Sequence, residues 1–232
     1  MRIMESLLSK FSIQVCESVY LKNPETSDLG LKIIIGSIDM LDDIGFDQFT
    51  FRKLAKEIGS TEASIYRYFE SKHKLLLYLT SWYWSWLEYR VVFGTANVPS
   101  VIDRLKISVK IITEKIESED HSFSHINEVK LNRILVSEAS KSYLTKKVDV
   151  ENKEGAFADY KELVARISQF ILEHNTGYKY PQMLISTILE GAHLQHFFAD
   201  HLPKLTNTYK GENSITDFYT DLLLKAIEVN EK

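Results

Sequence analysis

The polar side chains with the most informative spacing lie between Gly45 and Leu79, in the sequence GFDQFTFRKLAKEIGSTEASIYRYFESKHKLLLYL. Hydroxyl, guanidinium and ammonium groups recur there at intervals that suit hydrogen bonding to phosphate oxygens and to base edges. The sequence shows no glycine-rich phosphate loop, paired-cysteine zinc pattern or nucleophile elbow, which counts against enzymatic chemistry. We therefore expect a nucleic-acid-binding segment and no catalytic residue, cofactor or metal site.

Two short helices joined by a glycine turn would present these side chains. Thr50 can cap the first helix, because its hydroxyl accepts a backbone N–H that has no partner at a helix start. Gly59 should end that helix, since glycine tolerates the left-handed conformation, and Ser60 or Thr61 can cap the next one. The apolar face of the first helix consists of Leu54, Ala55 and Ile58. Such a short turn between two helices is typical of a helix-turn-helix.

The second helix has one face for packing and one for a groove. Ile65 and Phe69 are four residues apart, so they can hold the helix against a core. The other face consists of small or hydrogen-bonding side chains: Ala63, Ser64, Tyr66, Arg67 and Tyr68. Positions 50 to 80 contain six Lys or Arg against three Asp or Glu, whereas the whole chain has a net charge of −4. This local positive charge favours DNA binding.

Packing alone would explain a pair of amphipathic helices, but it does not require this spacing of Thr, Gly, Tyr and Lys. The segment resembles the N-terminal domain of the TetR family of transcriptional regulators. The resemblance covers only about the first third of the chain. It rests on residues in the family's order and spacing: Gly45, Phe46, Thr50, Leu54, Ala55, Ile58, Gly59, Thr61, Ile65, Tyr66, Tyr68, Phe69, Lys72 and Leu75.

The resemblance implies a role for each polar side chain. It makes the segment from Thr61 to Phe69 a recognition helix that enters the major groove of double-stranded DNA, and Thr61 belongs to the predicted DNA-binding set. Positions that face base edges in relatives are Arg52, Glu62, Ala63 and Tyr66. Positions that touch phosphates in relatives are Thr50, Ser64, Arg67, Tyr68 and Lys72. Phosphate contacts fix the register on DNA, and base contacts choose the sequence.

Two of these residues have specific chemistry at base edges. Arg52 can donate two hydrogen bonds to guanine O6 and N7, and Glu62 can accept one from cytosine N4. Because phosphates repel a carboxylate, Glu62 has a second interpretation, in which it orients Arg67 or Arg52, and we favour this one. Ala63 stands where relatives often have glycine, which leaves the operator sequence unpredicted.

The composition predicts a cytoplasmic all-α protein. Hydrophobic residues make up 44% of the 232 residues, enough for a sizeable core in one small domain and one larger domain. Only nine Gly and four Pro occur, and apolar residues follow the helical period without an alternating strand pattern. We expect neither a membrane span nor a signal peptide. The single cysteine, Cys16, excludes an internal disulfide, and we interpret it as a packed thiol rather than a redox sensor.

Breaks in the pattern predict three regions. Residues 1–24 form a helical N-terminal extension, which can fold back on the core, lengthen a dimer contact or touch DNA, and we favour packing. Its apolar stripe consists of Met4, Leu8, Phe11, Val15 and Val19. Residues 25–79 form a three-helix helix-turn-helix DNA-binding domain, whose first helix starts at Thr26 or Ser27 and runs to Gly45. Residues 80–232 form a larger helical domain, for which the resemblance implies effector binding and dimerisation.

Ser71 can cap a long helix that begins near Lys72 and, in the resembling family, links the two domains. Its aromatic cluster consists of Tyr78, Trp82, Tyr83, Trp84, Trp86, Tyr89 and Phe93. An aromatic stripe can line a pocket for an apolar or aromatic effector, or it can form a seam of the core. We assign effector contact to Trp82, Trp86 and Tyr89, and expect at least half of the cluster to be core.

Further helices are predicted at 101–118, 126–136, 139–146, 155–174, 181–199 and 215–229. His193, His196 and Asp200 have spacings of three and four residues, so with His201 nearby they could share a face and hold a divalent metal. Hydrogen bonding at a subunit interface explains the same residues, and we favour it.

The pair of helices at 181–199 and 215–229 matches in position and length the pair that forms a four-helix dimer interface in the resembling family. Its apolar residues are Ile185, Ile188, Leu189, Ala192, Phe197, Phe218, Leu222, Leu223 and Ile227. Gly191 would let a partner helix approach closely. One recognition helix reads too few bases, whereas two related by symmetry read a palindrome, so we expect a homodimer.

These features together predict a repressor that binds a palindromic operator as a homodimer and releases it when a small molecule fills the C-terminal domain. Three alternatives stay open. A constitutive regulator would bind its operator without any ligand. A C-terminal domain that recruits another protein would lack a ligand-sized cavity, and DNA binding would not depend on a small molecule. An all-α enzyme would show no salt-sensitive binding to duplex DNA.

Overall fold

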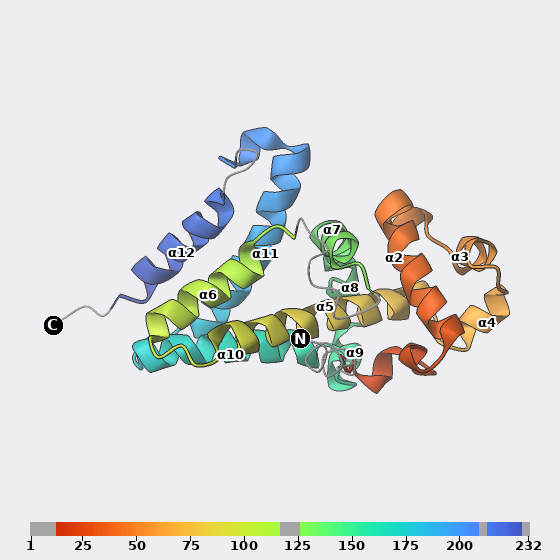
Figure 1. The fold of residues 1–232 in the computed structure, drawn as a ribbon, viewed down its shortest axis with the longest axis horizontal. Coiled ribbons are helices and arrows are strands. Elements are labelled where there is room, and N and C mark those ends of the chain that lie inside the picture. The colour runs from red at the N-terminus through yellow and green to blue at the C-terminus, as the bar shows by residue number, and fades with distance from the viewer. Residues whose placement is uncertain (1–12, 117–125, 209–212, 229–232) are drawn as a thin grey trace, which may run out of the picture. The chain divides into compact units, whose positions relative to one another are not determined.

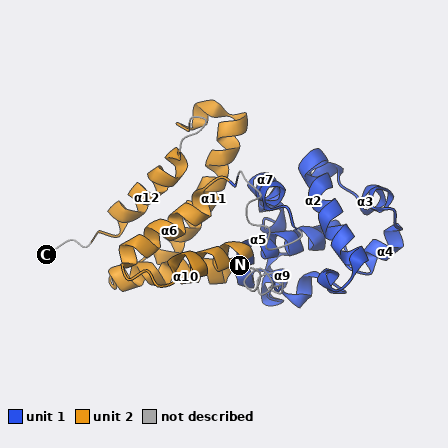
Figure 2. Cartoon of the chain, viewed as in Figure 1, with its two compact units in different colours: residues 1–85, 116–159 blue, residues 86–115, 160–232 orange. Residues whose placement is uncertain are grey.

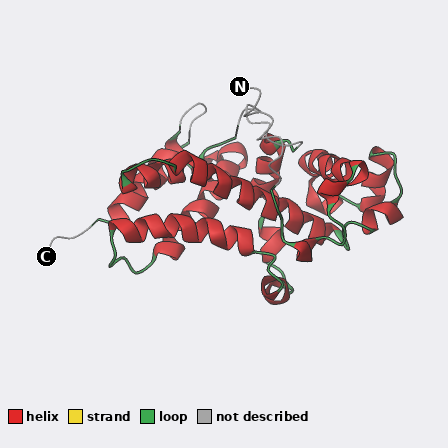
Figure 3. Cartoon of the chain, turned by 60° about the horizontal axis from the view of Figure 1, so that its bottom comes forward, coloured by secondary structure: helices red, strands yellow, loops and turns green. Residues whose placement is uncertain are grey.

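The structure is a computed structural model that describes residues 13–116, 126–208 and 213–228 (Figure 1). These residues form helices and turns and no strand, which confirms the predicted fold class for them (Figure 3). None of the helices in this part of the chain is long and apolar enough to cross a membrane. The predicted stripe at Met4, Leu8 and Phe11 and the predicted end of the helix at 117–118 lie outside the described residues.

The chain packs into two compact units (Figure 2). Unit 1 comprises residues 1–85 and 116–159, and unit 2 comprises residues 86–115 and 160–232. The long helix α5, Lys72–Thr95, contributes residues to both. This division describes packing, whereas the predicted division at residues 79 and 80 is functional and stays a prediction.

Unit 1 contains the helices of the expected helix-turn-helix and three further short helices. Their bounds are α2 Asp28–Gln48, α3 Phe51–Glu57, α4 Glu62–Tyr66, α7 Glu128–Glu138, α8 Ser140–Tyr143 and α9 Val148–Lys153. Every residue of α5 from Leu75 to Trp84 is buried, as expected for a helix that forms the centre of a core. The N-terminal half of α5 thus lies in the core of unit 1, where the Phe69 and Tyr78 rings are 5.5 Å apart.

Three ion pairs join α2 to α7 and α8, and we call them the ion-pair row. The pairs are Asp39–Lys130 at 2.7 Å, Asp42–Arg133 at 2.6 Å and Asp47–Lys141 at 2.9 Å. The partners are more than 90 residues apart in the sequence. Because α2 is the first helix of the expected DNA-binding domain, this row fixes later parts of the chain to that domain.

The described part of the N-terminal extension is not an α-helix. Its residues run as irregular chain with two 3-10 turns, Glu17–Val19 and Pro24–Thr26, so the helix predicted through Val19 is wrong here. Tertiary contacts replace the helix: Val19 is buried, and the Leu21 N–H donates to the Tyr68 carbonyl over 2.7 Å. The half-buried Cys16 thiol lies 3.3 Å from the Ser18 hydroxyl.

Unit 2 contains α6 Val101–Thr113, α11 Pro181–His201 and α12 Ser214–Ala226, which pack on one another, and most of α10 Ala158–His174. A Cβ atom at Gly191 would lie 2.1 Å from the Tyr219 hydroxyl. The close approach at Gly191 is therefore made by α12 of the same chain, which corrects the predicted approach of a partner helix. Ile185, Ile188, Leu189 and Ala192 are buried within the chain.

Candidate nucleic-acid interface

Side-chain caps build the helix-turn-helix as the sequence predicts. Ser27, Thr50, Thr61 and Ser71 each accept a hydrogen bond from the backbone N–H three residues ahead, over 3.2–3.3 Å. Each hydroxyl thereby satisfies a donor that the helix start would leave without a partner. The predicted starts of the first four helices of this region are confirmed.

The turn between α3 and α4 depends on Gly59. Its φ is +66°, in the left-handed region, and a Cβ atom added there would meet nothing within 4 Å. Backbone conformation rather than space therefore selects glycine at this position. The Ser60 N–H donates to the Ala55 carbonyl over 2.8 Å, which closes the end of α3 in the manner of a Schellman motif.

Lys72 has a different position from the one predicted. Its ammonium donates to the carbonyls of Phe46 and Phe49, at 2.9 and 3.2 Å, and lies 4.5 Å from the centre of the Phe46 ring. Carbonyls that follow a helix end favour such a cation. The side chain predicted to touch phosphate is thus engaged within the domain, where it ties the end of α2 to the start of α5.

Six exposed side chains of α3, α4 and the residue that follows α4 form one candidate surface, which we call the α3–α4 face, and the exposed Lys53 and Glu57 of α3 are not part of it. It consists of Arg52, Lys56, Glu62, Ala63, Tyr66 and Arg67. Within the described residues, no hydrogen bond or ion pair holds the side chains of Arg52, Lys56 or Glu62. The charged groups of this face therefore keep their capacity to bind another molecule.

Glu62 and Tyr66 differ in how the structure holds them. Glu62 forms no ion pair with Arg52 or Arg67 in the described part of the chain, and its two predicted roles, orienting an arginine and contacting cytosine, both stay predictions. Tyr66 is 47% exposed, and its ring packs edge-to-face on that of Phe51 at 5.0 Å. The Tyr66 ring is thus supported from within while it stays accessible.

Three hydroxyls predicted to touch DNA lie at the edge of this face. Thr50 and Thr61 are exposed, and Ser64 is half-buried. The hydroxyls of Thr61 and Ser64 are 2.8 Å apart. All three lie on the helix starts that cap α3 and α4, where backbone N–H groups also favour a negative charge.

Tyr68 is buried, which differs from the predicted direct phosphate contact. Its hydroxyl lies 2.8 Å from that of Ser27 and accepts from the Lys22 ammonium at 3.3 Å. The hydrogen bond with Ser27 and the nearby charge of Lys22 hold the pKa of Tyr68 below its usual value. The exposed group at this position is Lys22, which sequence reasoning missed because its contact is 46 residues away.

The residues predicted to contact an effector do not form one cluster within a unit. Trp82 belongs to unit 1, whereas Trp86 and Tyr89 belong to unit 2. Both tryptophans are buried, and the Arg90 guanidinium lies 4.8 Å from the Trp86 ring. Such burial is typical of a core seam, and their effector role stays a prediction.

His193 and His196 of α11 differ in burial and in their hydrogen-bond partners. Burial lowers the pKa of His193 to about 4. His196 Nε2 donates to the Thr113 carbonyl over 2.8 Å, and Asp200 pairs with Lys115 at 3.5 Å. Within the described residues, no group of three His, Cys, Asp or Glu side chains is placed to hold a metal ion.

Comparison with known proteins supports the helix-turn-helix assignment. Residues 33–79 match the family model for bacterial regulatory proteins of the tetR family. Comparison with curated proteins gives no match.

Solved structures have a similar fold. They include the superantigen PfiT (15% identity, 88% of this chain and 97% of that chain, TM-score 0.54). They also include a putative transcriptional regulator of the TetR family from Vibrio parahaemolyticus (18% identity, 84% of this chain and 96% of that chain, TM-score 0.52). A third is AibR in complex with isovaleryl coenzyme A and operator DNA (14% identity, 82% of this chain and 95% of that chain, TM-score 0.50). At these identities the similarity shows the fold alone, and the same fold serves proteins of different function.

Proposed function

We propose that this protein, whose residues 33–79 form an N-terminal domain of the TetR family, is a cytoplasmic transcription regulator that binds double-stranded DNA. The observation that carries the proposal is the α3–α4 face. It presents exposed charged groups on a helix-turn-helix whose backbone is fixed by four side-chain caps. Fixed geometry is important because a recognition helix must match the positions of base edges in the groove.

The α3–α4 face supports a division of roles. We assign base contacts to Arg52, Glu62, Ala63 and Tyr66. We assign phosphate contacts to Thr50, Thr61, Ser64 and Arg67, and we add Lys22 because it is exposed beside Tyr68. Tyr68 and Lys72 support the interface indirectly, because their polar groups bind within unit 1. Removal of a phosphate contact should weaken binding to all DNA sequences alike, whereas removal of a base contact should also relax sequence specificity.

A homodimer through 181–199 and 215–229 is part of the proposal. Its support is the exposed apolar surface of α11 and α12, on which Met183, Leu194 and Phe218 are 66%, 53% and 58% exposed. Leu222 follows Phe218 by one helical turn and is also exposed. Burial of such a patch in a symmetric contact would place two recognition helices for a palindromic operator.

The dimer is tested by Phe218→Glu, with Gln169→Glu on α10, exposed and outside both helices of the proposed contact, as the control. Sedimentation velocity should give a dimer for the natural chain and for the control, and a monomer for Phe218→Glu. A natural chain that sediments as a monomer at micromolar concentration would contradict this part of the proposal.

We further propose that the protein is a repressor released by a small apolar or aromatic molecule, with Trp82, Trp86 and Tyr89 as its contacts. The complex of AibR with a coenzyme A thioester and operator DNA supports this for a protein of the same fold. A ligand releases DNA only when it binds the arrangement without DNA more tightly. Screening for molecules that lower operator affinity tests this point.

Fluorescence anisotropy with duplex DNA tests the main proposal. The duplexes are the region immediately upstream of the protein's own coding sequence and a randomised pool, each titrated over a salt series. We expect saturable, salt-dependent binding, and a loss of roughly 1–3 kcal/mol on Arg67→Ala or Tyr66→Ala. Failure to bind either duplex at low salt would contradict the proposal and favour a role in protein recruitment.

A further inference from the structure

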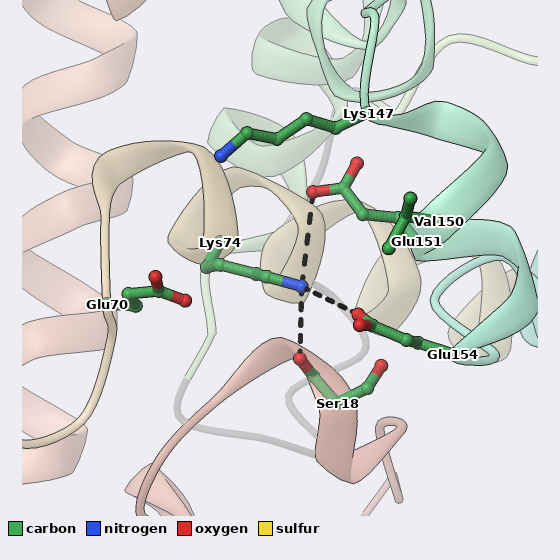
Figure 4. Close-up of a pocket in the computed structure, with 7 residues that line it drawn as sticks. All are labelled: Ser18, Glu70, Lys74, Lys147, Val150, Glu151 and Glu154. Atoms are coloured by element: carbon green, nitrogen blue, oxygen red, sulfur yellow. Dashed lines mark hydrogen bonds and ion pairs between the residues drawn. The ribbon is translucent and has the colours of Figure 1, made fainter.

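A cavity of about 580 Å³ lies within unit 1, between the start of α5, helix α9 and the N-terminal segment (Figure 4). Its lining residues are Ser18, Glu70, Lys74, Lys147, Val150, Glu151 and Glu154. The volume is in the range of sites that bind small molecules. The lining shares no residue with the α3–α4 face or with the predicted effector contacts.

The charges on the floor of the cavity already have partners. Lys74 Nζ donates to the Ser18 carbonyl at 3.2 Å and lies 3.4 Å from Glu154 Oε2, as Figure 4 shows. The buried Glu151 carboxylate lies 3.9 Å from the same ammonium, and His73 Nε2 is 2.9 and 3.1 Å from its two oxygens. Each charged group of the floor thus has a partner within the protein.

The rim of the cavity differs from its floor. Glu70 and Lys147 are exposed, and within the described residues neither side chain forms a hydrogen bond or an ion pair. In Figure 4 the Lys147 side chain extends above Lys74, and Glu70 lies to the left of Lys74. Val150 is 58% exposed and adds an apolar group. The rim thus offers one negative, one positive and one apolar group.

We propose that this cavity binds a zwitterion with apolar side chains, of the type of a short apolar peptide. Its ammonium would bind Glu70, its carboxylate would bind Lys147, and a side chain would cover Val150. A simple anion would meet three carboxylates in the lining, and a simple cation would meet the free ammonium of Lys147. A molecule with both charges satisfies both groups of the rim.

The position of the site gives it a regulatory consequence, which rests on the proposed function. Glu70 lies in the turn after α4, and Lys74 lies in the first turn of α5. A ligand here contacts the chain directly after the recognition helix, on a route separate from the predicted effector residues. Ligand binding itself is measured without DNA, so it stands or fails independently of the proposed function.

Isothermal titration calorimetry on the full chain tests the site with three probes: the dipeptide Leu-Leu, its N-acetyl form and its C-terminal amide. We expect Leu-Leu to bind in a saturable manner, and each capped form to bind about fivefold more weakly, the size of a partly exposed charge pair. Glu70→Gln should weaken the binding of Leu-Leu. It should not further weaken the binding of the acetylated form, which has no ammonium to pair with Glu70. Lys147→Met should weaken the binding of Leu-Leu. It should not further weaken the binding of the amide, which has no carboxylate to pair with Lys147.

Two neighbouring exposed residues provide matched controls. Lys146→Met and Asp149→Asn change the same charges outside the lining and should leave Leu-Leu binding unaltered. Thermal unfolding confirms that all four variants fold. The proposal is overturned when Leu-Leu gives no saturable heat at millimolar concentration, or when the rim substitutions weaken all three probes equally.

Discussion

The α3–α4 face and the ion-pair row are two charged surfaces of unit 1, and they differ in whether their charges have partners. In the row, three carboxylates of α2 each bind a cation from α7 or α8 at 2.6–2.9 Å. On the α3–α4 face, Arg52, Lys56 and Glu62 have no such partner within the described residues. The comparison teaches that charge alone does not mark a binding surface. Charges with partners join helices, and charges without partners can bind another molecule.

Ile65→Ala should produce the largest effect, because Ile65 is fully buried beneath the α3–α4 face. Loss of its packing should lower the free energy of unfolding by about 2–5 kcal/mol, measured by urea denaturation. Its exposed neighbour provides the contrast: Tyr66→Ala should retain most of the stability and lose DNA affinity. Equal destabilisation by the two substitutions would show that the face is not available to DNA in the way we describe.

Glu138→Ala should give the next largest effect. One Glu138 oxygen accepts the Phe46 N–H over 3.0 Å and the other pairs with Lys141 at 2.9 Å, next to Gly45 with its φ of +71°. Removal of the carboxylate leaves a partly buried N–H without a partner, which costs about 1–3 kcal/mol of unfolding free energy. DNA affinity of the folded variant should be unaltered. A matching loss of affinity would mean that this contact also positions the recognition helix.

Lys22→Gln and Lys130→Gln form a matched pair, since each removes one positive charge from unit 1. Lys22 is exposed beside Tyr68, whereas Lys130 belongs to the ion-pair row. Only Lys22→Gln should reduce the slope of log affinity against log salt, by about one unit for one lost phosphate contact. Equal slopes for the two variants would assign Lys22 a purely structural role.

The smallest effect is expected from alkaline pH. The hydrogen bond to Asp39 raises the pKa of Lys130 above its usual value of 10.5. The folded state therefore holds this proton more tightly than the unfolded state, so the contribution of the pair to stability is present below pH 10.5. It is lost as pH rises through the higher pKa of the folded state.

The stabilisation by this pair should be under about 1 kcal/mol, as is usual near a surface. The difference in Tm between the natural chain and Asp39→Asn should shrink as pH rises from 9.5 to 11.5. For Asp42→Asn the difference should persist, because the guanidinium of Arg133 keeps its charge throughout that range. Parallel behaviour of the two variants would contradict the assigned role of Lys130.

Local features of the fold were predictable from the sequence. Caps at Thr50, Thr61 and Ser71, and the turn at Gly59, depend on backbone groups within a few residues, so their chemistry is visible in the residue types. The same holds for the break of α2 at Gly45, where φ is +71°.

Distant contacts were not predictable in this way. The partners of Tyr68 and Lys72 depend on how separated segments fold together, so the sequence did not show that both side chains have partners inside unit 1. Gly191 shows the same limit, because a small residue indicates close approach without indicating which helix approaches. The extension likewise has a helical pattern, but its described part follows a path set by the contact of Leu21 with Tyr68.

The hydrogen bonds of Lys72 to Phe46 and Phe49 close a loop in the chain. The Lys72 side chain thereby joins the residues that precede and follow the segment from residue 50 to residue 71. The segment also packs on the rest of unit 1 through the buried Leu54, Ile65 and Phe69, so an exchange that keeps these side chains should leave the surrounding frame intact. We expect a graft of a foreign helix-turn-helix between these ends to transfer the DNA preference of its donor, so that specificity can diversify while the scaffold persists.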